Sequence, residues 1–201
     1  MTKSVVLDSH KNLVEMLEKS REIYSDRPLF GTKRDGIYEW TTYEQFSEKV
    51  DAFRGGLASL GVNSEDKVAI ISKNTEEWAV SAYATYGLCG QHIPMYENQM
   101  VKEWEYIIRD CGAKVLLVAN EIIFDQTKEF PEKIDTLEHV VLLAETSVGD
   151  MKTYKNLMEI GRKNPVEALQ PDPTSPMGMI YTSGTTGNPK GVMLTHGNLI
   201  S

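Results

Sequence analysis

The sequence is poor in residues that could hold a metal ion or a disulfide framework. Its 201 residues include two cysteines, Cys89 and Cys111, and four histidines. The cysteines form no CxxC pair, so neither a disulfide framework nor a structural zinc site is expected. We expect two reduced thiols in apolar surroundings.

Positive charge is also scarce. Lysine and arginine together number 21 against 29 aspartates and glutamates, which leaves a formal net charge of −8. Such a chain has no excess positive field to attract phosphates, so broad binding to nucleic acid or to an anionic membrane is not expected. An anionic ligand would have to be held by a local group of residues.

Long uninterrupted apolar segments are missing as well. The first apolar run ends at Asp8, which is too early for a secretory signal. Residues 78–96 carry no Asp, Glu, Lys or Arg, but they include residues that would break or hydrate a lipid-exposed helix: Gly87, Gly90, Gln91, His92 and Pro94. We interpret this range as a buried helix, a turn and a buried strand. We expect a cytoplasmic protein without a transmembrane segment, for which peripheral contact with a membrane stays open.

Two common nucleotide-binding motifs are absent. The Walker A pattern GxxxxGK[ST] fails because Pro189 stands five positions after Gly184, and Val192 stands five positions after Gly187. No GxGxxG pattern occurs. The sequence therefore excludes a Walker-type NTPase and lacks the dinucleotide fingerprint.

Helix and strand patterns alternate along most of the chain. Apolar residues at helical spacing predict helices over 12–24, 42–60, 74–86, 98–111, 121–130 and 153–163. Short apolar runs predict strands at 67–71, 92–95, 114–118, 140–143 and 177–181, and the Asp35-Gly36 pair predicts a hairpin. Continuous apolar strands that alternate with helices indicate an α/β fold with a largely parallel sheet covered by helices.

Polar residues predict where the helices begin. Thr42 and Gln45 have the spacing of a capping box, and Asn74, Asn98 and Thr195 are predicted to cap later helices. Glycines at the other ends, in Leu60-Gly61-Val62 and after Cys111, predict helix stops.

The prolines at 171, 173 and 176 favour an extended connection. We therefore divide the chain into an α/β part over 1–169, a linker over 170–176, and a hairpin with the start of a helix over 177–201.

The segment from Thr182 to Gly191 has the composition that wraps a polyphosphate. Of its ten residues, four carry hydroxyls, three are glycine and one is Lys190. Glycines allow close backbone approach, N–H groups and hydroxyls donate to phosphate oxygens, and the ammonium offsets charge. Each hydrogen bond to a charged acceptor contributes about 1.5–3 kcal/mol. Val192 and Leu194 alternate like a strand, so the loop is predicted to join two strands.

Residues 181–199 resemble the AMP-binding signature of the adenylate-forming superfamily, which includes acyl-CoA synthetases, luciferases and the adenylation domains of peptide synthetases. The upstream chain resembles the long-chain fatty acid–CoA ligase branch at 40–43, 60–62, 67–71, 74–78, 93–96 and 106–115.

The resemblance implies a two-step reaction. ATP and a fatty acid give an acyl-adenylate and pyrophosphate, and the CoA thiol then displaces AMP. It also implies which residues bind the nucleotide: Thr182, Ser183, Gly184, Thr185, Thr186 and Gly187 contact the phosphates, and Lys190 is their cationic partner and the catalytic residue. Thr185 or Thr186 would contact Mg²⁺.

Other features of this family are missing from the sequence, among them the Tyr-Gly-x-Thr-Glu run and the distal catalytic lysine. We therefore expect an N-terminal part of a ligase, the N-terminal subdomain of an acyl-CoA synthetase-like fold, inactive by itself and prone to self-association through uncovered apolar surface. The alternative is a naturally short, non-catalytic nucleotide-binding or interaction module of the same fold. The length of the acyl chain stays open.

Three aromatic or imidazole side chains have simpler interpretations. Trp78 and Trp104 lie at helical spacing that favours packing in the core. His196 could polarise a substrate or could stand at a helix start, and it is not included among the catalytic residues.

Overall fold

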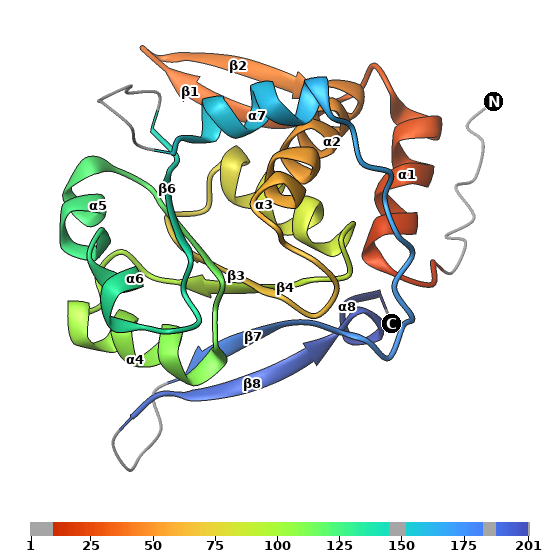
Figure 1. The fold of residues 1–201 in the computed structure, drawn as a ribbon. Coiled ribbons are helices and arrows are strands. Elements are labelled where there is room, and N and C mark those ends of the chain that lie inside the picture. Colours follow the sequence, from red (N-terminus) through yellow and green to blue (C-terminus); the bar gives the residue numbers. More distant parts are fainter. Residues whose placement is uncertain (1–9, 145–151, 183–187, 201) are drawn as a thin grey trace.

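A computed structural model describes residues 10–144, 152–182 and 188–200 (Figure 1). Its helices are α1 (Leu13–Tyr24), α2 (Tyr43–Ser59), α3 (Glu76–Tyr86), α4 (Val101–Cys111), α5 (Glu121–Thr127), α6 (Phe130–Lys133), α7 (Tyr154–Lys163) and α8 (His196–Ile200). Its strands are β1 (Pro28–Arg34), β2 (Ile37–Thr42), β3 (Lys67–Ile71), β4 (Gln91–Met95), β5 (Val115–Val118), β6 (His139–Leu142), β7 (Pro176–Thr182) and β8 (Lys190–Thr195).

Six strands form one sheet in the order β6-β5-β3-β4-β7-β8. All neighbouring pairs are parallel except β7 and β8, which are antiparallel. The predicted α/β class with a largely parallel sheet is confirmed. The strands before and after the proline-rich segment 170–176 belong to this same sheet, and the proposed division of the chain there stays a prediction.

Helices cover both faces of the sheet (Figure 1). Val68 and Ile70 of β3 pack in one cluster with residues of α2, α3 and α7. Their neighbours Ala69 and Ile71 pack in a second cluster with residues of α4, α5 and α6. Because successive side chains of a strand point to opposite faces, a strand buried on both sides reads as a continuous apolar run.

Helices α2 and α7 pack so closely that their contact depends on glycine. A Cβ atom on Gly161 would lie 1.8 Å from the carbonyl oxygen of Ala52, and one on Gly56 would lie 2.5 Å from that of Leu157. No side chain fits between these backbones, so the pair of glycines sets the approach of the two helices.

The β1–β2 hairpin confirms the expected turn. Asp35 and Gly36 both have positive φ, 48° and 84°, as a two-residue turn between antiparallel strands requires. The ring of Phe30 lies 5.1 Å from that of Phe46, so the hairpin rests on α2.

Most predicted helix boundaries are confirmed. The Thr42–Gln45 capping box is present, α2 is followed by Gly61 at φ 79°, and α4 is followed by Gly112 at φ 67°. Thr195 accepts a hydrogen bond from the amide of Asn198 at 3.3 Å and opens α8.

Two predicted caps are wrong by one or two residues. Helix α3 is capped by Thr75, whose hydroxyl accepts from the amide of Trp78, and not by Asn74. Helix α4 begins after Met100, not after Asn98, because the carboxylate of Glu103 accepts from the amide of Met100 at 2.9 Å.

The helix expected over 121–130 ends at Thr127, and a separate short helix, α6, begins at Phe130. Pro131 explains the break, because its ring would clash with the carbonyl of Thr127 in a continuous helix. In the first turn of α6 the missing N–H of proline costs nothing.

Candidate phosphate-binding site

The β7–β8 hairpin lies at the edge of the six-stranded sheet. Its strands pair from Pro176 opposite Thr195 to Thr182 opposite Lys190, so the prediction that the loop joins two strands is confirmed. Ser183, Gly184, Thr185, Thr186 and Gly187, the residues expected to contact phosphate and Mg²⁺, lie outside the described residues. Thr182 and Lys190 are the two predicted site residues whose places are described.

Thr182 and Lys190 stand opposite each other on the same face of the hairpin. Both side chains are exposed. Directly opposed side chains on antiparallel strands have Cβ atoms about 4.5–5.5 Å apart. None of the ion pairs between described residues involves Lys190. A hydroxyl donor and an ammonium group therefore stand together where the loop begins and ends.

The hairpin loop leaves the sheet at its carboxyl edge. Strands β3, β4 and β7 are parallel and end at Ile71, Met95 and Thr182. Open α/β sheets bind ligands in the crevice beyond the carboxyl ends of their strands. The loop thus begins on the edge of the sheet where this class of fold places its ligands.

A depression of about 480 Å³ opens at this edge. Residues that follow β3 and β4 and residues of β7 line it, including Asn74, Tyr96 and Tyr181, with Trp78 of α3. A larger depression of about 870 Å³ lies between α2 and the segment after α7 and shares no lining residue with the first.

The two tryptophans expected in the core, Trp78 and Trp104, differ in their surroundings. Trp104 is buried, as predicted, and its Nε1 donates to the carbonyl of Tyr96 at 3.0 Å. Trp78 is half-buried, packs edge-on against His92 and forms part of the 480 Å³ depression.

His196 is buried at the start of α8. Its Nδ1 accepts from the amide of Leu13 at 3.4 Å, and its ring lies edge-on to Tyr86. Burial lowers the pKa of its imidazole. These contacts join α8 to α1 and α3, as a helix-start residue with a packing role would do.

Both cysteines are free thiols. Burial raises the pKa of Cys111 to about 11, and the same cause raises the pKa of Cys89. In the described ranges no group of His, Cys, Asp or Glu side chains is placed to hold a metal ion. The described helices include none that is long and apolar enough to cross a bilayer.

Sequence reasoning missed one residue beside the hairpin. Asp110 of α4 accepts a hydrogen bond from the hydroxyl of Tyr181 at 2.6 Å. The two residues are 71 positions apart, and no spacing rule links a helix carboxylate to a strand tyrosine at that distance.

Comparison with known proteins decides the family. The AMP-binding enzyme family matches residues 17–201. The chain belongs to this family. The long-chain-fatty-acid–CoA ligase ACSBG1 of Homo sapiens is 31% identical over 198 residues, which cover 94% of this chain and 27% of that protein. Fatty acyl-CoA synthetase B of Dictyostelium discoideum is 31% identical over 213 residues, 96% of this chain and 31% of that protein. The chain thus spans between a quarter and a third of the length of these relatives.

Solved structures agree with this assignment. The anthranilate CoA ligase AuaEII in complex with anthranoyl-AMP matches with a TM-score of 0.82 and 26% identity, covering 97% of this chain and 36% of that one. The long-chain-fatty-acid–CoA ligase FadD1 of Archaeoglobus fulgidus matches with a TM-score of 0.79 and 21% identity, covering 98% and 38%, and supports the fold. The expected acyl-CoA synthetase-like fold is therefore confirmed.

Proposed function

We propose that this chain supplies the phosphate-binding part of an ATP-dependent, AMP-forming long-chain fatty acid–CoA ligase. The observation that carries the proposal is the pairing of Thr182 with Lys190 at the neck of a hairpin on the carboxyl edge of the sheet. The names of the relatives support the reaction class, because they are fatty acyl-CoA ligases and synthetases.

In the first step a fatty acid carboxylate attacks the α-phosphorus of ATP and pyrophosphate leaves. Charge builds on the departing pyrophosphate, so positioned donors and a cation lower the barrier. Lys190 is the cation in this proposal, and Thr182, Ser183, Gly184, Thr185, Thr186 and Gly187 supply hydroxyl and amide donors. In the second step the CoA thiol attacks the acyl carbon and AMP leaves.

The proposed site residues offer hydroxyl and amide donors and one ammonium group. These groups suit the phosphates of ATP better than they suit a dedicated metal site. Mg²⁺ prefers oxygen ligands and is often bound through one or two protein groups together with substrate phosphates and water. The described residues offer no carboxylate cluster. Mg²⁺ would then be bound by Thr185 or Thr186 together with the phosphates of ATP.

The experiment uses the complete protein that carries this chain. Purified protein is given ATP, Mg²⁺ and palmitate, and radioactive pyrophosphate is followed into ATP; CoA is then added and palmitoyl-CoA is measured. Exchange followed by thioester formation is the expected result. ATP binding without either reaction would overturn the ligase and favour a nucleotide-binding module. A series of shorter and longer acids tests the preference for long chains. A cytoplasmic location with peripheral membrane contact also stays a prediction, which fractionation of cells would test.

A further inference from the structure

The hydrogen bond between Tyr181 and Asp110 joins the β7–β8 hairpin to helix α4. Tyr181 is the residue before Thr182 in β7, and Asp110 lies in the last turn of α4. The Oη···Oδ2 distance of 2.6 Å is typical of a charge-assisted hydrogen bond. Among the side-chain hydrogen bonds of the described residues, this is the one that joins β7 or β8 to α4.

Gly191 makes room for this contact. It stands opposite Tyr181 in the register of the hairpin. A Cβ atom on Gly191 would lie 3.0 Å from Cζ and 3.2 Å from Oη of Tyr181. The phenol ring therefore crosses β8 over the bare backbone of the glycine, and a larger residue there would push its hydroxyl from Asp110.

The hydroxyl is well suited to donate. Tyr181 is half-buried and packs with Met179 against the apolar cluster of α4. Burial, together with the carboxylate of Asp110, raises the pKa of Tyr181. The phenol therefore keeps its proton at physiological pH.

Both strands carry a predicted phosphate contact one residue beyond this pair. Thr182 follows Tyr181, and Lys190 precedes Gly191. Successive side chains on a strand point to opposite faces. The ring of Tyr181 therefore packs on one face of the hairpin, and Thr182 and Lys190 stand on the other.

We propose that Tyr181, Asp110 and Gly191 form a clamp that positions Thr182 and Lys190 for the phosphates of the nucleotide. We call these three the Tyr181 clamp, and they are positioning residues. The identity of the ligand rests on the proposed function, whereas the contact that fixes the hairpin to α4 is formed by residues of this chain.

The first test measures directly how strongly the clamp stabilises the hairpin. Hydrogen exchange of the amides of Thr182, Lys190 and Gly191 is followed in the complete protein, for the wild type and for Tyr181→Phe. Tyr181→Phe keeps the ring and removes the donor, so exchange is expected to rise about tenfold, the effect of losing one hydrogen bond. Asp110→Asn keeps an acceptor and is expected to stay near wild type, whereas Asp110→Ala is expected to match Tyr181→Phe.

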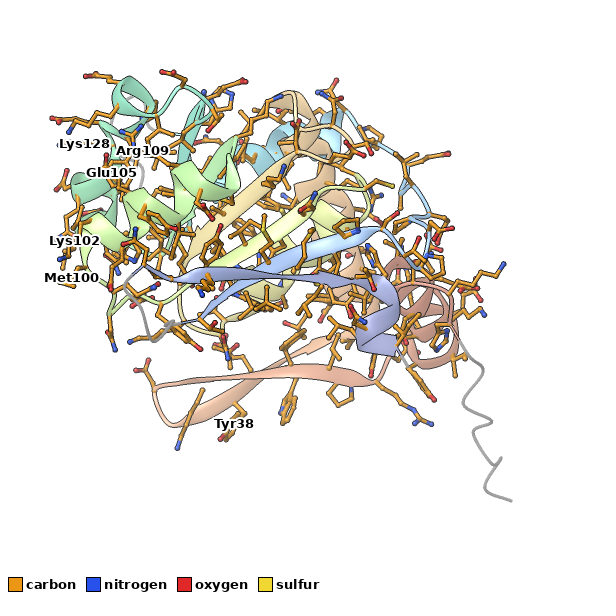
Figure 2. The ribbon with its side chains drawn as sticks, turned by 90° about the horizontal axis from the view of Figure 1, so that it is seen from below. Tyr38, Met100, Lys102, Glu105, Arg109 and Lys128 are labelled. Carbon is orange, nitrogen blue, oxygen red and sulfur yellow. The ribbon has the colours of Figure 1, made fainter. Side chains whose placement is uncertain are left out.

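Arg109→Ala is the matched control. Arg109 is the exposed neighbour of Asp110, and its side chain pairs with Glu105 inside α4 (Figure 2). Exchange at the hairpin is expected to stay unchanged in this variant. An unchanged rate in Tyr181→Phe would overturn the clamp, and so would an equal rise in Arg109→Ala.

The second test separates positioning from simple loss of folded protein. In Tyr181→Phe, adenylate formation is expected to slow about tenfold, while thioester formation from preformed acyl-adenylate keeps its wild-type rate. Asp110→Asn is expected to retain most of the first activity. Equal losses in both half-reactions would overturn the positioning role.

The two proposals can fail separately. A wild-type protein that forms no acyl-adenylate would overturn the proposed function, and hydrogen exchange would still decide whether the clamp holds the hairpin. An active ligase in which Tyr181→Phe changes neither exchange nor the adenylation rate would overturn the clamp alone.

Discussion

The central strands and the β7–β8 hairpin belong to one sheet but differ in what surrounds them. Every residue of β5 is buried, as are all but the first of β3. In β8 the first four residues are exposed, from Lys190 to Met193. Buried strands owe their sequence to packing, whereas a strand with an open face can carry groups that meet a ligand. The chemistry of this chain is accordingly expected at the edge of its sheet.

The largest expected effect is on folding and tests the central strands. Ile70→Ala removes a fully buried side chain and is expected to lower the free energy of unfolding by about 3–4 kcal/mol. The matched variant in the hairpin is Val192→Ala, at a position that is 48% exposed, where a change within about 0.5 kcal/mol is expected. Denaturant unfolding of both variants measures the difference. Similar losses would show that the hairpin is packed as tightly as the centre.

The second prediction concerns the rate of catalysis and not the stability of the fold. Under the proposed function, Lys190→Ala in the complete protein is expected to slow adenylate formation about a hundredfold, the scale for removing a group that stabilises developing charge. Thioester formation from preformed acyl-adenylate is expected to be spared, because pyrophosphate has left by then. Lys102→Ala, at an exposed lysine of α4 labelled in Figure 2, is the control. Equal slowing of both half-reactions would rule out this role for Lys190.

The third prediction concerns pH and tests the junction between the two regions. His92 of β4 is buried against Trp78, its Nε2 lies 3.1 Å from the hydroxyl of Ser81, and burial lowers its pKa to about 3. In the unfolded chain the pKa returns to about 6.5, so the unfolded state binds more protons between these values. Stability is expected to fall as pH drops below 6.5, by about 2 kcal/mol at pH 5.

Burial also lowers the pKa of His196, which contributes a loss in the same direction. His92→Gln removes the larger contribution and is expected to flatten the dependence, although it lowers stability at pH 7. Urea titrations at several pH values measure both slopes. The same slope in wild type and variant would contradict the assignment.

The smallest expected effect is association through the outer strand. Val192 and Met193 are exposed on β8, the last strand of the sheet among the described residues, and Leu199 is exposed on α8. Exposed apolar side chains and sheet edges favour pairing with another chain. The chain is expected to self-associate weakly in sedimentation experiments. Met193→Lys is expected to reduce association, and Ile122→Lys, at an exposed position on α5, serves as the control. A monodisperse wild-type monomer would contradict the expectation.

Sequence patterns predicted the layout of the chain well and its fine boundaries less well. Apolar runs identified β3 to β7, and Asp35-Gly36 identified the first hairpin. The caps at Asn74 and Asn98 were wrong because several polar residues near each helix start could serve, and the choice depended on which side chain reached a free amide. The break between α5 and α6 had a local cause in Pro131 that apolar periodicity overlooked.

The family, the fold class and the strand–loop–strand character of the segment around Lys190 were determined by the sequence alone, because each depends on residues close together in the chain. Tertiary structure decided which residues from distant parts of the sequence are in contact. It placed Gly161 against Ala52, packed α8 against α1 through His196, and brought Asp110 within hydrogen-bond distance of Tyr181. These contacts join residues far apart in sequence, and only the packing of helices on the sheet brings them within reach of one another.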